Sequence, residues 1–114
     1  MEFNPVPVFK ALGCRARFEI FSLLLENQLC VGAIAERLEV SQPSVSQHLK
    51  VLKQAGIVED RRCGYHVHYT VNEELIRHTA DFIAAMTVKH KGENPCGKEG
   101  EGKCARKNVT TLKG

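Results

Sequence analysis

The sequence predicts a mainly α-helical domain that carries one β-hairpin. Apolar residues recur at helical spacing through most of the chain, one Ser-Gln-Pro segment has the residues of a helix start, and one later segment alternates strictly between two kinds of residue. At 114 residues the chain has room for a single hydrophobic core. We assign the folded domain to residues 1–91, and we expect residues 92–114, rich in Gly, Lys and Glu, to form a flexible tail.

The spacing of apolar residues predicts five helices, at residues 6–12, 15–26, 31–38, 42–55 and 73–90. The apolar stripe of the first contains Val6, Phe9 and Leu12, and that of the second contains Phe18, Phe21, Leu24 and Leu25. The stripe of the last is wide for a lone surface helix, and we interpret it as a dimer interface: Leu75, Ile76, Phe82, Ile83 and Met86.

The fourth helix has two chemically different faces. Ser41 is a good N-cap candidate, Pro43 suits the first turn, and Gly56 stops the helix. The apolar stripe lies at i, i+4 and i+7: Val45, Leu49 and Leu52. At about 100° per residue, the opposite face carries Ser46, Gln47, Lys50 and Gln54. One side should therefore pack on the core while the other presents hydrogen-bonding side chains.

A β-hairpin is predicted after this helix. Residues 57–62 form its first strand, Cys63-Gly64 its turn and residues 65–71 its second strand. In the second strand two sets of side chains face opposite ways, the first being Tyr65, Val67, Tyr69 and Val71, and the second His66, His68 and Thr70.

Helix, short turn, helix and hairpin follow one another in the order of a winged helix-turn-helix. The residues in this order resemble the ArsR/SmtB family of metal-responsive repressors over roughly residues 8–86. The resemblance is carried by Phe9-Lys10-Ala11-Leu12 with Arg17, Leu29-Cys30-Val31-Gly32, Ser41 to Leu49, and Gly64-Tyr65-His66-Val67. It implies a homodimer whose two recognition helices enter successive major grooves of a palindromic operator in double-stranded DNA.

Residue type assigns the contacts to DNA. Glutamine can pair bidentately with adenine, and serine and lysine reach bases or phosphates. We place Gln42, Ser44, Ser46 and Gln47 in the groove, and Lys50 on the DNA backbone. Arg61 and Arg62 of the hairpin should neutralise phosphates. Three more candidates complete the set: His48, for which core packing is an alternative, and Tyr65 and His66 in the segment that resembles the family's wing.

Composition limits the class of protein. The net charge of +3 is only weak support for a nucleic-acid partner. The first residues lack a signal-peptide pattern and no apolar segment approaches the ~20 residues that span a bilayer, so we expect a cytoplasmic protein without a membrane partner. Cys-x-x-Cys motifs and phosphate-cradling loops are absent, which argues against a thiol enzyme. No organic cofactor is expected.

The five cysteines suggest thiolate chemistry, because a reducing compartment disfavours structural disulfides. The resemblance implies two kinds of sensory site. The zinc-type site on paired C-terminal helices falls near Glu73, Leu75, Met86 and Lys89, of which only the first could ligate, so this site is absent. The thiolate site includes the cysteine that matches Cys30, but the usual Cys-Val-Cys pattern ends here in Gly32.

Cys96 and Cys104 are the only soft groups in the tail and could supply the missing thiolates. Our leading hypothesis is a repressor released from its operator by arsenite or antimonite bound to Cys96, Cys104 and one body cysteine, for which we favour Cys30. Cys14 is interpreted as an exposed spectator and Cys63 as a spectator on the turn, and zinc chelation by His66 with His68 is disfavoured.

Two alternatives with the same fold stay open. A redox or reactive-sulfur sensor would use Cys30 as the reactive thiol and form a disulfide or polysulfide bridge. A sensor of a soft divalent metal (cadmium, lead or zinc) would use the same sulfurs with four ligands. The redox sensor predicts release from DNA by an oxidant without metal and reversal by a dithiol, and titration spectroscopy distinguishes three sulfur ligands from four.

Overall fold

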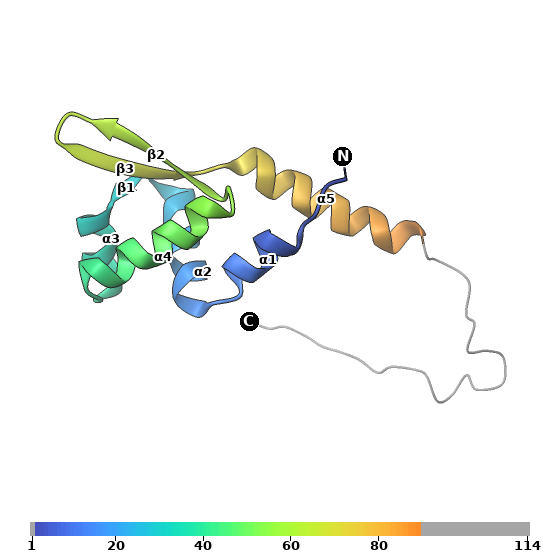
Figure 1. Cartoon of the computed structure of the whole chain (residues 1–114), viewed down its shortest axis with the longest axis horizontal. Helices are drawn as coiled ribbons and strands as arrows, with labels where there is room; N and C mark the ends of the chain where they lie inside the picture. The colour runs from blue at the N-terminus through green and yellow to red at the C-terminus, as the bar shows by residue number, and fades with distance from the viewer. Residues whose placement is uncertain (1, 90–114) are drawn as a thin grey trace. The chain divides into compact units, whose positions relative to one another are not determined.

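The computed structural model describes residues 2–89, and the structural statements below concern these residues. Along the chain, the elements are α1 (Val6–Leu12), α2 (Arg15–Glu26), β1 (Leu29–Cys30), α3 (Val31–Leu38), α4 (Gln42–Gln54), β2 (Val58–Cys63), β3 (His66–Val71) and α5 (Glu73–Lys89) (Figure 1). The predicted fold class, mainly α with a β-hairpin wing, is confirmed. Residues up to Ala84 form one compact unit; the domain boundary predicted at residue 91 lies outside the described residues and stays a prediction.

The bounds of α1 and α2 match the prediction, but part of the predicted buried face is wrong. In α1, Val8 and Ala11 are buried, whereas Val6 and Phe9 remain roughly half exposed. In α2 the buried residues are Ile20, Phe21 and Leu24, while Phe18 and Leu25 lie exposed. Each helix has apolar residues around more than one side, so helical spacing alone does not decide which set packs inside.

Helix α4 packs against α1, α2, α3 and β2. As predicted, Ser41 caps α4: its Oγ accepts a hydrogen bond from the Ser44 amide at 3.2 Å. The helix ends at Gln54, and Gly56 follows with φ +83°, a conformation that glycine adopts without strain. The predicted stripe is confirmed, since Val45, Leu49 and Leu52 are all buried.

The core is built mainly from aliphatic side chains that are almost completely buried: Ile20, Ile34, Val45, Leu49, Leu52, Ile57 and Val58. Burying one such side chain contributes roughly 1.5–3 kcal/mol. These residues come from α2, α3, α4 and the start of the hairpin. The helix-turn-helix is therefore packed against several elements, and the buried side of α4 fixes the direction in which its exposed side faces.

The sheet has three antiparallel strands in the order β1-β3-β2, one more than predicted. Strand β1 is only two residues long and pairs Leu29 with Tyr69 and Cys30 with His68. The predicted hairpin turn is shifted by one residue: Cys63 ends β2 opposite His66, and Gly64 (φ +64°) with Tyr65 forms the turn. We call the hairpin of β2 and β3 the wing. In Figure 1 its tip extends away from the helices.

Asn72 connects the start of α5 to the end of α4. Its backbone amide donates to the Ile57 carbonyl at 2.8 Å, its side-chain amide donates to the Gly56 carbonyl at 3.2 Å, and its Oδ1 accepts from the Leu75 amide at 3.2 Å. The last of these bonds caps α5. None of the helices within residues 2–89 is long and apolar enough to cross a membrane.

Part of the predicted dimer stripe on α5 is already covered by this chain's own N-terminal segment. The Phe3 ring packs edge-on against His78 at 4.3 Å and against Phe82 at 5.3 Å between centroids. Leu75, Ile76, Phe82 and Ile83 are half-buried and Met86 is exposed. The sequence pattern missed this contact because Phe3 and α5 are far apart along the chain.

Candidate nucleic-acid interface

The outward face of α4 is mainly polar, with Val51 as an exposed apolar residue near its end. Its exposed residues include Gln42, Ser46, Gln47, Lys50 and Gln54. The buried stripe lies on the opposite side, so the two-faced helix predicted from the sequence is confirmed. Short or unbranched polar side chains on a rigid helix are what a major groove admits, because they reach base edges without blocking the approach of the backbone.

Two of the predicted groove residues are less accessible than the others. Ser44 is half-buried, and its amide is already bound by the Ser41 cap. His48 is also half-buried, as expected of a side chain at the edge of the core stripe. The exposed candidates on α4 are thus Gln42, Ser46, Gln47 and Lys50.

The wing carries the second group of predicted contacts. Arg61, Arg62 and His66 are exposed, and the Tyr65 side chain in the turn is 100% exposed. Arg61 pairs with His68 and Arg62 with Val67 in the strand register, so the two arginines point to opposite faces of the hairpin. A single DNA strand that follows one face of the wing would therefore meet only one of them.

An ion pair that the sequence did not predict joins the wing to α4. The Lys53 ammonium donates to Asp60 Oδ2 at 2.8 Å. This hydrogen bond is the main reason why the pKa of Lys53 is raised and the pKa of Asp60 is lowered. The pair links α4 to β2. Sequence patterns did not predict it because its two residues lie on different elements.

Cys30 occupies a junction in the fold. It is the last residue of β1, the N-cap of α3 and the cross-strand partner of His68, and its side chain is half-buried. Cys63 is exposed at the end of β2. Cys96 and Cys104 lie outside the described residues. Within residues 2–89, no three His, Cys, Asp or Glu side chains are grouped so that they could hold a metal ion.

Cys14 is half-buried, not exposed as predicted. It is the N-cap of α2, and its pKa is lowered chiefly by the backbone amide of Arg17; burial opposes this effect, and the Ala16 amide and the Arg17 charge add to it. His66 and His68 stack on one face of β3 with ring centroids 6.3 Å apart. In the strand register His68 lies opposite Cys30 and His66 lies opposite Cys63, but within residues 2–89 neither pair gains the third ligand that a metal site of this kind would need.

Several known proteins are similar to this chain in sequence and in fold. The model of the bacterial regulatory protein arsR family matches residues 14–60. The chain is 34% identical over 87 residues to the transcriptional repressor SdpR of Bacillus subtilis (strain 168), covering 76% of this chain and 94% of SdpR. It is 36% identical over 80 residues to the arsenical resistance operon repressor of Escherichia coli (strain K12), covering 69% of this chain and 68% of that protein.

Among solved structures, the chain is similar to the homodimeric winged helix-turn-helix DNA-binding domain of a possible ArsR-family transcriptional regulator from Mycobacterium bovis. The TM-score is 0.61 at 30% identity, with 78% of this chain and 85% of that chain covered. The chain therefore belongs to the ArsR family of bacterial regulatory proteins, which are winged helix-turn-helix regulators of transcription and not enzymes.

Proposed function

We propose that this protein is a homodimeric repressor that binds a palindromic operator through α4 and the wing, and that leaves it when arsenite or antimonite binds its thiolates. The observation that carries the proposal is the position of Cys30: it is the N-cap of α3, the helix that directly precedes the polar-faced α4. A ligand at this cysteine would act on the helix-turn-helix itself.

The proposed DNA contacts use the exposed residues first. Gln42, Ser46 and Gln47 would read base edges, and Lys50 with one wing arginine would contact phosphates. Dimerisation would place two copies of α4 about one DNA turn apart. The homodimeric relative from Mycobacterium bovis supports this part of the proposal.

The proposed sensor combines Cys30 with Cys96 and Cys104. Three soft thiolates suit trivalent arsenic or antimony, and the similarity to the arsenical resistance operon repressor supports this choice of inducer. Buried Ile34 and Ala35 on α3 belong to the same core as Val45 and Leu49 on α4, so a pull on Cys30 would be transmitted to α4. A coupling of about 1–3 kcal/mol would suffice for an ordinary switch.

The test is a fluorescence-anisotropy titration of DNA binding with sodium arsenite, cadmium, zinc and inorganic polysulfide in separate arms. Wild type should be released by arsenite, whereas Cys30→Ser, Cys96→Ser and Cys104→Ser should bind DNA normally and resist release. Cys63→Ser is the matched control, because this exposed wing thiol lies outside the proposed site and its loss should leave the response intact.

Three outcomes would contradict the inducer or its site. Release by polysulfide and not by arsenite would favour the reactive-sulfur sensor, and release by cadmium or zinc alone would favour the divalent-metal sensor. A full arsenite response in all three cysteine variants would show that the sensing site lies elsewhere. None of these outcomes would affect the assignment of DNA binding to α4.

A further inference from the structure

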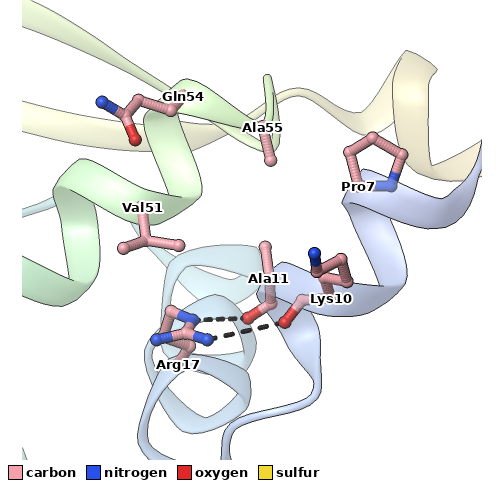
Figure 2. A pocket seen from close by; sticks show the side chains of 7 residues that line it. All are labelled: Pro7, Lys10, Ala11, Arg17, Val51, Gln54 and Ala55. Carbon is pink, nitrogen blue, oxygen red and sulfur yellow. Dashed lines mark hydrogen bonds between the residues drawn. The ribbon is translucent and has the colours of Figure 1, made fainter.

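A shallow pocket of about 350 Å³ lies between α1, α2 and α4. Figure 2 shows the side chains that surround it, with Pro7, Lys10 and Ala11 coming from α1, Arg17 from α2, and Val51, Gln54 and Ala55 from the end of α4. Its floor is apolar, and the polar groups at its edge are an ammonium, a guanidinium and a primary amide. All of these groups can donate hydrogen bonds.

The guanidinium is held in place by the backbone of α1. Arg17 Nε donates to the Ala11 carbonyl at 2.6 Å, and Arg17 Nη2 lies 3.5 Å from the Lys10 carbonyl (Figure 2). The pocket has no acidic lining residue, and among residues 2–89 no salt bridge involves Lys10 or Arg17. The pocket thus presents two positive charges that no described carboxylate neutralises.

The pocket lies beside the outward face of α4. Val51 and Gln54 follow Gln47 at i+4 and i+7, so they lie on the same side of the helix as this predicted base contact. Seven residues of α-helix rise about 10.5 Å, and the major groove is about 12 Å wide. If Gln47 reads a base in the groove, the Gln54 end of α4 lies near the groove edge, where the sugar-phosphate backbone runs.

We propose that this pocket binds one phosphate of the DNA backbone at the edge of each half-site, with Lys10 and Arg17 supplying the charge and Gln54 a hydrogen bond. The inference depends on the proposed DNA binding by α4 and adds α1 and α2 to the contact surface.

The test measures how DNA affinity depends on salt concentration for wild type and for Lys10→Gln. Each protein is titrated with a duplex that wild type selects from a random-sequence pool and with an unrelated duplex. Each phosphate that is no longer neutralised lowers the slope of log K against log salt by about 0.9, so a dimer that lacks both Lys10 side chains should lose up to about 1.8 from its slope, less the share of each phosphate charge that Arg17 still neutralises. Affinity should fall by the same factor on both duplexes, because a phosphate contact carries no sequence information. Gln54→Glu, which adds a negative charge at the pocket edge, should lower the affinity for both duplexes as well.

Arg77→Gln is the matched control, since it also removes one positive charge per subunit, but from an exposed side chain on α5. Its slope should stay that of wild type. An unchanged slope in Lys10→Gln would overturn the phosphate site, as would a shift of Lys10→Gln from dimer to monomer, which would place the pocket in the dimer interface. If wild type bound no duplex at all, the proposed function would fail as well. Binding by wild type with an unchanged slope in Lys10→Gln would instead contradict the phosphate site alone.

Discussion

Individual side chains on α4 differ in what their loss should reveal. Gln47 and Lys50 are neighbours on the exposed face, three residues apart on one helix. The Gln47 amide can both donate to and accept from a base edge, whereas Lys50 carries a point charge that we assign to the DNA backbone. Their substitution should therefore separate sequence readout from general attraction to DNA.

Gln47→Ala should cost about 1–3 kcal/mol of binding to the selected operator and much less on an unrelated duplex, because it removes a base contact. Lys50→Ala should lower the affinity for both duplexes by the same factor and lower the slope of log K against log salt. Anisotropy titrations at several salt concentrations measure both quantities. Equal losses on the two duplexes for Gln47→Ala would show that this residue does not read sequence.

Gly32 offers a gain-of-function variant. A Cβ added there would lie 3.6 Å from Gln42 Nε2, which is ordinary van der Waals contact, so the backbone and its neighbours can accept a side chain. Gly32→Cys restores the Cys-Val-Cys spacing, and we expect arsenite to release DNA at a lower concentration than in wild type. Gly32→Ser is the matched control for size. If the cysteine variant responded no better than the serine variant, Cys30 would not be part of the arsenite site.

Among the elements, long helices could be predicted from sequence and short or distant features could not. The α4 bounds and faces follow from a strong N-cap, a regular stripe and a glycine stop. Strand β1, with only two residues, has no alternation to detect. The predicted turn of the wing is wrong by one residue, because Cys63 and Tyr65 can each stand in a strand or in the turn. Only the pairing of β2 with β3 determines that Cys63 lies in the strand and Tyr65 in the turn.

The N-cap of α2 is Cys14, whose side chain makes no capping hydrogen bond in the structure, although the nearby amides of Arg17 and Ala16 favour its thiolate form. Cys14→Asp should stabilise the fold by about 0.5–2 kcal/mol, because a carboxylate accepts from the first amides and suits the positive end of the helix. Thermal unfolding should then occur a few degrees higher. Cys14→Ala controls for loss of the thiol, and equal melting temperatures in the two variants would contradict the capping role.

The link between α4 and the wing should respond to acid. Because the pKa of Asp60 is lowered in the folded protein, its contribution is complete above the ordinary aspartate pKa and is lost as pH falls through the lowered value. Titration of the Asp60 carboxyl by NMR should give a pKa below about 3.9 in wild type, and Lys53→Met should raise it toward that value. The same pKa in both proteins would show that the ion pair does not persist in solution.

At the scale of the whole molecule, the decisive relations join residues that sequence patterns cannot connect. The Lys53–Asp60 pair, the Phe3 contact with α5 and the pocket between α1, α2 and α4 all depend on how elements pack. The exposed apolar residues on α1 and α2, among them Val6, Phe9, Phe18 and Leu25, are further surface that a second copy could cover. We therefore expect the dimer interface to involve more than the predicted stripe on α5.

Selection of duplexes from a random-sequence DNA pool by the purified full-length protein tests the central claim, that the outward face of α4 reads DNA in a dimer. Wild type should enrich an inverted repeat whose half-site centres are about 10–10.5 base pairs apart, and Gln47→Ala should change the bases enriched at one position of each half-site. Enrichment of no sequence, or of the same repeat with unchanged bases in Gln47→Ala, would contradict that claim.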